Sequence, residues 1–408
     1  MSTKNQSAEK KTNLKGSCHL PAFGKHIGIL IVAFGVIIYF ICLTTFDYHV
    51  IYGNIAKVRN DATITVNNSK ENNTQILFMT SSLIEVDAVL SKNTLNKTYL
   101  ISWYNTPDFY SKDQRTTNLE NCEFKNCIIT TNRSLNEVSD ILLFYHNTLP
   151  ANPPENMKPI WVFVTYESPY HAQNYNAPNW QNKFDWTMTY RKDSEGFSPY
   201  DVIVRRDTVQ NINYSDIFIK KTKNIAWVVS NCNTVSKRMN YVKEMQKVIN
   251  VDIFGACGNF ICNGNRLECR QHLGKDYKFY LAFENSLCND YITEKLFDIY
   301  LNVDMVPIVR CAPNIKDHVP NGTYISTSDF NSPNSLAMFL KQLGSDENRY
   351  ISYLQEKNKF IAKNGYINFD FGYCNLCKML NNVGPKKGGK LNISNWIWKN
   401  QCHAPSDI

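Results

Sequence analysis

The sequence predicts an α/β fold made of two Rossmann-like halves, and three observations support this prediction. The chain has 408 residues, of which 43% are hydrophobic, so it is too long for one ordinary core and too apolar to be largely disordered. Short apolar runs typical of buried strands recur along it, with spacers long enough for helices. A second series of such runs starts near Lys223.

In the first half, apolar runs predict strands at residues 76–79, 99–103, 141–145 and 160–165. The long spacers between them favour alternation of strands with helices over β-hairpins.

In the second half, strands are predicted at 225–229, 251–255, 277–283 and 306–309. A helix is predicted over 236–249, because its apolar residues recur at helical spacing, and Ser236 is its expected N-cap. A second helix is expected from about 293 to 301. The resulting succession, strand-helix-strand-strand-helix-strand, is typical of a nucleotide-binding half. Ligands of such folds bind at the carboxyl ends of the strands.

A run of twenty residues without a charged side chain, 27–46, predicts one membrane-spanning helix. A cleaved signal peptide is the alternative, but its apolar region is usually shorter and ends at a small-residue cleavage site. The preceding tail, 1–26, carries five lysines and one glutamate, a net charge of +4. The positive-inside rule then places residues 47–408 in the lumen. The whole chain carries +8, too modest a charge to argue for a nucleic-acid partner.

Glycosylation motifs and cysteines agree with a lumenal location. Seven Asn-x-Ser/Thr motifs follow the predicted anchor, at Asn67, Asn72, Asn96, Asn132, Asn213, Asn321 and Asn392. Eleven of the thirteen cysteines also follow it, where oxidation is permitted. Because eleven is odd, at least one of them is either a buried free thiol or bonded to another chain in a homodimer.

The predicted organisation is therefore a tail, an anchor, a polar Asn-rich stem, two α/β domains and a C-terminal segment. Their expected bounds are 1–26, 27–46, 47–75, 76–215, 216–365 and 366–408.

The segment 277–307, YKFYLAFENSLCNDYITEKLFDIYLNVDMVP, resembles the signature of the α1,3-fucosyltransferases. Four further segments resemble parts of that family in the same order: 166–171 (YESPYH), 184–200, 226–232 (AWVVSNC) and 251–258 (VDIFGACG). The resemblance spans roughly residues 76–380. It implies a type II Golgi membrane enzyme with the GT-B arrangement of two Rossmann-like domains. The implied donor is GDP-fucose, and the implied acceptor is a glycan on a glycoprotein.

Breaking the bond from fucose to GDP builds negative charge on a phosphate, which a cation must stabilise. The chain has no Asp-x-Asp that would hold a metal, so no metal is expected to be required, although stimulation by Mn²⁺ or Mg²⁺ stays open. Arg238 and Lys295 are the candidate cations, because each lies in the first turn of a predicted helix. The resemblance supports both assignments. The alternative for each is a solvated charge on a helix surface.

Other residues are expected to hold the donor. Glu294 can accept hydrogen bonds from two ribose hydroxyls, although a glutamate at a helix start is also favoured by the helix dipole. Ser230 and Asn231 follow a predicted strand at the ligand edge. Asn285 and Tyr291 are donor contacts by resemblance, and Tyr291 taken alone is more often an ordinary half-buried aromatic.

The acceptor hydroxyl needs a base, and Glu167 is the candidate. It follows the predicted strand 160–165 and precedes a turn, so it is expected at the edge that faces the ligand. The resemblance implies the same role, with inversion at the sugar in a single displacement. The alternative is a carboxylate that caps the turn or pairs with an arginine.

The remaining cysteines suggest disulfides. The resemblance implies that Cys374 and Cys377 bond to cysteines such as Cys122 and Cys127. At least one bridge is expected among the three cysteines of the insert 257–269, and Cys232 and Cys288 are a further candidate pair.

Two segments depart from the family pattern. Residues 310–313 occupy a position where the family usually has a glycine-rich sequence. Residues 145–147 occupy a position where the family often has His-His-Arg.

Two other functions stay open at this point. One is an inactive homologue that binds glycans in the lumen, and the other is a metal-dependent transferase for a different sugar nucleotide.

Overall fold

The computed structural model describes residues 97–110, 119–172, 177–363, 369–385 and 389–408, all of which lie in one compact unit, Glu85–Ile408. The expected tail, anchor, stem and strand 76–79 fall outside the described residues. No helix in the described ranges has the length and apolar character needed to cross a membrane.

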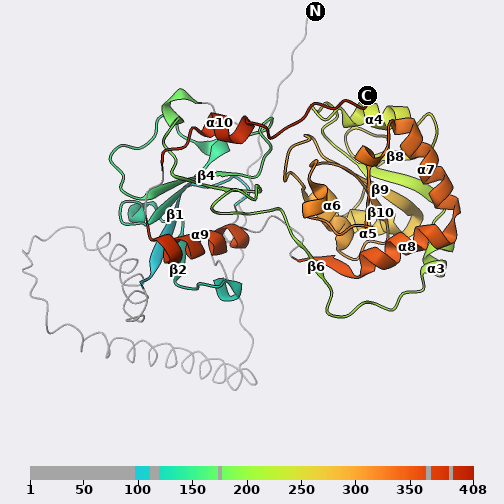
Figure 1. Cartoon of the computed structure of the whole chain (residues 1–408), viewed down its shortest axis with the longest axis horizontal. Helices are drawn as coiled ribbons and strands as arrows, with labels where there is room; N and C mark the ends of the chain where they lie inside the picture. Colours follow the sequence, from blue (N-terminus) through green and yellow to red (C-terminus); the bar gives the residue numbers. More distant parts are fainter. Residues whose placement is uncertain (1–96, 111–118, 173–176, 364–368, 386–388) are drawn as a thin grey trace, which may run out of the picture. The chain divides into compact units, whose positions relative to one another are not determined.

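The first sheet has five parallel strands in the order β2-β1-β3-β4-β5. Figure 1 labels β1, β2 and β4 of this sheet. The strands are β1 (Tyr99–Asn105), β2 (Cys127–Thr130), β3 (Ile141–Tyr145), β4 (Ile160–Thr165) and β5 (Trp186–Thr189). The strands predicted at 99–103, 141–145 and 160–165 are confirmed. All five residues of β3 and all six of β4 are buried, because both faces of a parallel sheet are covered.

The prediction of helices between these strands is wrong for the described residues. The connections hold 3₁₀ turns instead: η3 (Leu119–Asn121), η4 (Arg133–Leu135), η5 (His146–Thr148) and η6 (Pro178–Trp180). The covering helices come from the far end of the chain. Helix α9 (Asp370–Val383) packs with Ile141 and Leu143 of β3, whereas α10 (Ile393–Trp398) packs with Leu142 and Phe144. Since alternate residues of a strand point to opposite faces, the two helices cover opposite faces of the sheet.

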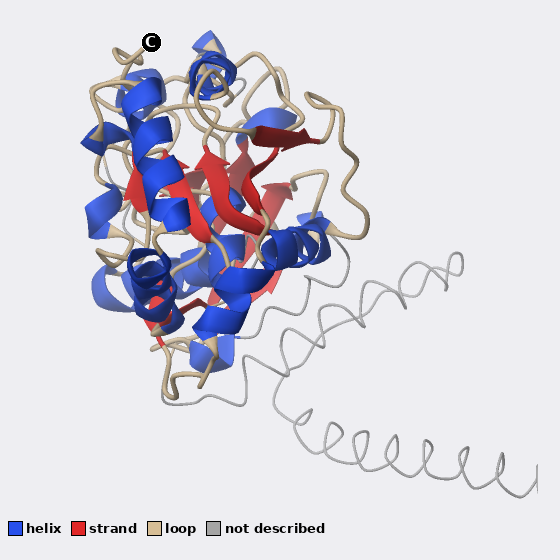
Figure 2. Cartoon of the chain, turned by 90° about the vertical axis from the view of Figure 1, so that its right-hand side faces the viewer, coloured by secondary structure: helices blue, strands red, loops and turns tan. Residues whose placement is uncertain are grey.

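The second sheet also has five parallel strands, in the order β11-β10-β9-β7-β8. They are β7 (Lys223–Val228), β8 (Val251–Phe254), β9 (Tyr277–Phe283), β10 (Val306–Arg310) and β11 (Ile325–Ser326). The other elements of this part are β6 (Ile203–Arg205), α3 (Tyr214–Lys220), α4 (Arg238–Met245), α5 (Arg266–Asp276), α6 (Glu294–Phe297), η7 (Asp298–Tyr300), η8 (Ile315–Asp317), η9 (Thr327–Asp329), α7 (Pro333–Ser345), α8 (Glu347–Asn358) and β12 (Phe360–Ala362). Figure 2 shows the strands enclosed by helices.

All four strands predicted in this half are confirmed. The prediction that β9 follows β8 without a helix between them is wrong, because α5 lies between the two strands. Its buried residues are Cys269, Arg270, Leu273 and Gly274, so no apolar stripe marks it in the sequence. The helix expected over 236–249 is confirmed but shorter, and the one expected over 293–301 is an α-helical turn, α6, followed by the 3₁₀ turn η7.

Both sheets have the same strand order. In each sheet, the strand that comes first in the sequence lies between the strands that come second and third. Connections leave such a sheet in opposite directions at that point, which opens a crevice at the carboxyl ends of the strands. In the second sheet this point lies between β7 and β9.

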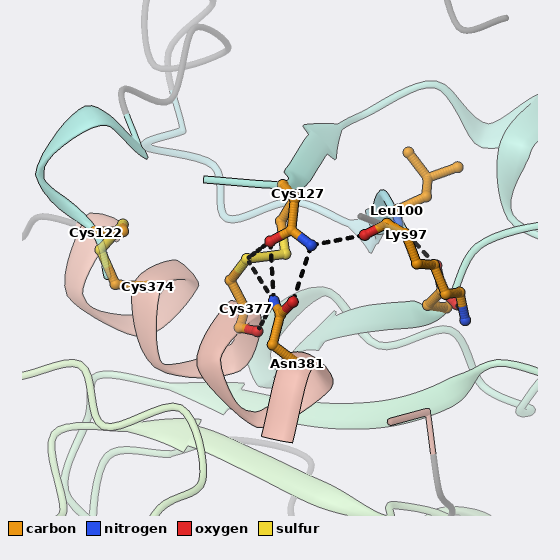
Figure 3. Close-up of a disulfide and its surroundings, with 9 residues drawn as sticks. Lys97, Leu100, Cys122, Cys127, Cys374, Cys377 and Asn381 are labelled. Carbon is orange, nitrogen blue, oxygen red and sulfur yellow. Dashed lines mark hydrogen bonds and ion pairs between the residues drawn. A yellow bond between two sulfur atoms is a disulfide. The ribbon is translucent and has the colours of Figure 1, made fainter. Parts of the chain in front are cut away.

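Five disulfides tie these elements together. The bridges Cys122–Cys374 and Cys127–Cys377 fasten α9 beside β2, as the resemblance implied (Figure 3). The insert contains Cys262–Cys269, as expected. The suggested pair Cys232–Cys288 is wrong: Cys232 bonds to Cys257 in the loop after β8, and Cys288 bonds to Cys402.

Cys311 is the unpaired cysteine among the described residues. Burial raises the pKa of its thiol well above the usual value, which is typical of an unreactive thiol.

Candidate active site

Most of the residues expected to bind the donor lie at the carboxyl edge of the second sheet. Ser230 and Asn231 follow β7 and are exposed, while Glu284 and Asn285 follow β9. Since β7 and β9 are hydrogen-bonded neighbours, these polar residues flank the point where the strand order reverses.

Arg238 is the first residue of α4 and is buried. Its Nη1 donates to the carbonyl of Phe283 at 2.6 Å and its Nη2 to the carbonyl of Asn231 at 3.1 Å. Burial lowers the pKa of Arg238, although nearby Glu284 favours its charged form. Its Nε has no hydrogen-bond partner among the described residues. The guanidinium is therefore held between β7 and β9 by backbone carbonyls.

The expected N-cap of α4 is wrong. Lys237, with a φ of 50°, holds that position without a capping side chain. The hydroxyl of Ser236 instead donates to the carbonyl of Glu284 at 2.7 Å, because the left-handed residue turns the chain back toward β9.

Lys295 lies between two carboxylates. Its Nζ is 2.9 Å from Oε2 of Glu284 and 3.3 Å from Oε1 of Glu294, and it donates to Oγ1 of Thr293 at 2.7 Å. Burial alone would lower the pKa of Lys295, but the two carboxylates raise it, so the lysine is cationic. The positive charge of Arg238 acts in the opposite direction and lowers this pKa.

Glu284 is a residue of this site that sequence reasoning missed. Its side chain is fully buried and accepts from the backbone N–H of Thr293 at 2.9 Å and from its hydroxyl at 2.8 Å. Burial raises the pKa of Glu284, an effect that Lys295 opposes. The available signal was an acidic residue directly after the apolar run 279–283 in the 277–307 motif.

Glu294 begins α6 and is partly exposed. Burial acts to raise its pKa, but Lys295, Arg266 and Arg270 together lower it, so the group is a carboxylate. Both arginines also pair with buried Asp298, at 3.2 and 2.9 Å.

Glu167 follows β4, at the carboxyl edge of the first sheet. Oε2 of Glu167 accepts a hydrogen bond of 3.2 Å from the hydroxyl of Tyr291, which comes from the loop after β9. Next to this contact, the hydroxyls of Ser168 and Ser286 are 2.8 Å apart. Burial, reinforced by Glu167, raises the pKa of Tyr291 well above its usual value, so the phenol is a neutral donor. The structure thus brings Glu167 to the loop that links β9 to Lys295.

The arrangement has a definite chemical capacity. Two cations and an exposed serine and asparagine at one sheet edge can hold a diphosphate, and a carboxylate from the other sheet can accept a proton. Within the described ranges no three His, Cys, Asp or Glu side chains are grouped to hold a metal ion. That a metal is not required stays a prediction.

Four of the seven predicted glycosylation sites lie in the described residues, and all four asparagines are exposed: Asn132, Asn213, Asn321 and Asn392. Asn67, Asn72 and Asn96 fall outside them.

Two family models match the chain. "Fucosyltransferase, N-terminal" matches residues 95–201, and "Glycosyltransferase family 10 (fucosyltransferase) C-term" matches 218–396. The glycoprotein 3-alpha-L-fucosyltransferase A of Drosophila melanogaster is 40% identical over 271 residues, which are 64% of this chain and 52% of that protein. The chain thus spans about half the length of that relative.

A human protein, 4-galactosyl-N-acetylglucosaminide 3-alpha-L-fucosyltransferase FUT6, is 32% identical, with 62% of this chain and 70% of the human protein aligned. Among solved structures, an alpha1,3-fucosyltransferase with GDP-fucose aligns over 72% of this chain and 96% of its own, with a TM-score of 0.45 and 18% identity.

Proposed function

The chain belongs to glycosyltransferase family 10, the fucosyltransferases, and we propose that it is an inverting, GDP-fucose-dependent α1,3-fucosyltransferase. The proposed reaction moves L-fucose from GDP-β-L-fucose to the 3-hydroxyl of an N-acetylglucosamine residue in a glycoprotein glycan. The acceptor class follows the name of the Drosophila relative, which acts on glycoproteins. The contact between Glu167 and Tyr291 carries the proposal, because it joins a candidate base to the segment that bears Lys295.

The proposed step is a single displacement. The acceptor oxygen attacks the anomeric carbon of fucose as its proton passes to Glu167, and the bond from that carbon to the β-phosphate oxygen breaks. Arg238 and Lys295 stabilise the negative charge that the departing GDP gains. Glu294 accepts from the ribose hydroxyls, and Ser230, Asn231, Asn285 and Tyr291 complete the donor contacts. Attack from the side opposite GDP turns the β-linked donor into an α-linked product.

We further propose a location and a cofactor requirement. The enzyme works in the Golgi lumen as a type II membrane protein with the two domains in the GT-B arrangement, held by the predicted anchor 27–46. It requires no metal, since side chains supply the positive charge that a divalent ion supplies in other sugar-nucleotide enzymes.

The test incubates the purified full-length protein with GDP-fucose and a panel of glycans that carry either core or antennal N-acetylglucosamine. Mass spectrometry should find fucosylated products in the presence of EDTA, and NMR should show their α1,3 linkage. The same panel with UDP-sugars is the control and should yield no transfer.

Other outcomes would contradict parts of the proposal. Glycan binding without transfer would identify a glycan-binding homologue. Activity lost in EDTA and restored by Mn²⁺ would refute independence from metal. Among active acceptors, the pattern of products decides between core and antennal sites, the latter being suggested by the name of the human relative.

A further inference from the structure

A C-terminal segment, residues 401–407, lies along the loop that follows β9. The backbone N–H of Asn289 donates to the carbonyl of Gln401 and that of His403 to the carbonyl of Leu287, each at 2.8 Å. The disulfide Cys288–Cys402 lies between these two hydrogen bonds. The segment is therefore fastened antiparallel to the loop that runs from Asn285 to Tyr291.

Beyond this attachment the segment reaches a buried arginine. Arg310, the last residue of β10, is 3% exposed and packs over the ring of Tyr241 at 4.5 Å. Its Nη1 and Nη2 donate to the two carboxylate oxygens of Asp407 at 2.5 and 2.8 Å. Because a buried guanidinium without a counter-charge is costly, Asp407 stabilises Arg310 in this place. The pairing also lowers the pKa of Asp407, against the effect of burial.

Arg310 in turn holds the segment that leads to Arg238. Its Nε and Nη2 both donate to the carbonyl of Ser236 at 3.2 Å. Ser236 also bonds the loop after β9, through its N–H to the carbonyl of Asn285 at 3.2 Å. Lys237, in the left-handed conformation, then turns the chain into α4, whose first residue is Arg238.

We infer that Arg310 and Asp407 are positioning residues of the donor site, which act through Ser236 on Arg238 and Asn285. The inference rests on the proposed function, because it takes this edge as the place of the nucleotide. Arg310, Asp407 and His403 also line a cavity of about 440 Å³ together with Leu287, beside the end of β10, and none of the residues expected to bind the donor lines it. The C-terminal segment is thus a structural part of the site, joined to it by one disulfide and one ion pair.

The test compares the full-length protein with its Asp407→Asn and Asp407→Glu variants. We expect Asp407→Asn to raise the Kd for GDP and the KM for GDP-fucose roughly tenfold, because the arginine loses its counter-charge and Arg238 shifts. The KM for the acceptor should change less than twofold. Asp407→Glu keeps the charge and should restore most of the affinity for GDP.

Asp276→Asn is the matched control. Asp276 pairs with Lys223 at 3.8 Å on the surface, away from this network, and its variant should keep the wild-type Kd and KM values. Thermal denaturation of each variant reports folding separately.

An unchanged Kd for GDP in Asp407→Asn overturns the inference. Equal changes in both KM values also overturn it, since a purely structural defect affects both substrates. If the wild type binds GDP but transfers no fucose, the proposed function fails, while the GDP affinities of the variants still test the positioning role of Arg310 and Asp407. A wild type that does not bind GDP refutes both.

Discussion

The proposed chemistry depends most on Glu167, because its carboxylate, at the carboxyl edge of the first sheet, is hydrogen-bonded to the loop that follows β9 in the second. Tyr291 donates to its Oε2, and the hydroxyls of Ser168 and Ser286 form a second contact between the same two loops. A carboxylate held in this way accepts a proton without first reorganising its surroundings. In the proposed reaction the two sheets have separate roles: the first supplies the base, and the second supplies the cations.

We predict that Glu167→Gln lowers kcat by about 10²–10⁴-fold, because the amide keeps the shape and the acceptor oxygen but cannot take up the proton. The Kd for GDP should stay within about twofold, since the donor contacts lie on the second sheet. Steady-state kinetics and calorimetric titration with GDP measure the two quantities. Glu137→Gln, at an exposed position, serves as the control and should behave as the wild type. Undiminished turnover in Glu167→Gln would refute its role as the base.

The sequence predicted individual elements well where burial on both faces leaves an unbroken apolar run, as in β3. Elements stabilised from a distance left no such signal. β2 is four residues long and is secured through the Cys127–Cys377 bridge, and α5 buries an arginine paired with Asp298 instead of an apolar stripe. The helices of the first sheet are far away in sequence, so no local pattern could assign α9 and α10 to it.

The same contrast between neighbouring residues and residues far apart in the sequence applies to the candidate site. That the polar residues of the 277–307 motif lie close together could be predicted, because they are adjacent in the chain. Glu284 was missed because it acts by stabilising Lys295 instead of facing a ligand. The link from Arg310 to Asp407 could not be predicted, because 97 residues separate the partners.

The two disulfides of α9 allow a prediction about this element. They close almost the same loop, with separations of 252 and 250 residues, so each is nearly redundant while the other is present. In the chain-entropy view, removing one releases only a short loop and costs about 2–3 kcal/mol, whereas removing both releases the long loop and costs roughly 5 kcal/mol more.

Cysteine-to-alanine variants of each pair, and of both, measured by denaturant unfolding, test this. Removal of Cys262–Cys269, which closes a seven-residue separation, is the control for a short loop. If the loss of one pair destabilises the protein as much as the loss of both, the bridges are not redundant.

At the scale of the whole molecule, residues at the carboxyl edges of the two parallel sheets contact each other. Glu167 and Ser168 come from the first sheet, and Tyr291 and Ser286 from loops of the second. Stability of the second sheet therefore matters for the whole site. Two buried lysines of this half, Lys221 and Lys357, are expected to make the free energy of unfolding depend on pH.

Both lysines donate to backbone carbonyls instead of pairing with a carboxylate in direct contact. Lys221 donates to the carbonyls of Gly274 and Tyr277, and Lys357 to those of Ile299 and Val303. Burial lowers the pKa of Lys221 to about 7 and that of Lys357 to about 8, from 10.5 for both. Between these values and 10.5 the unfolded chain binds more protons than the folded one, so the free energy of unfolding increases with pH.

We therefore predict that the free energy of unfolding rises between pH 7 and pH 9, by up to about 1.4 kcal/mol per pH unit for each lysine. Denaturant unfolding at a series of pH values measures this slope. Lys221→Met and Lys357→Met should each reduce it, whatever they do to the stability at pH 7, because the variant has lost the titrating group. Lys243→Met, at an exposed position, should keep the wild-type slope. A stability that is flat or falls over this range, or a slope unaffected by both variants, would show that the two lysines stay charged in the folded protein.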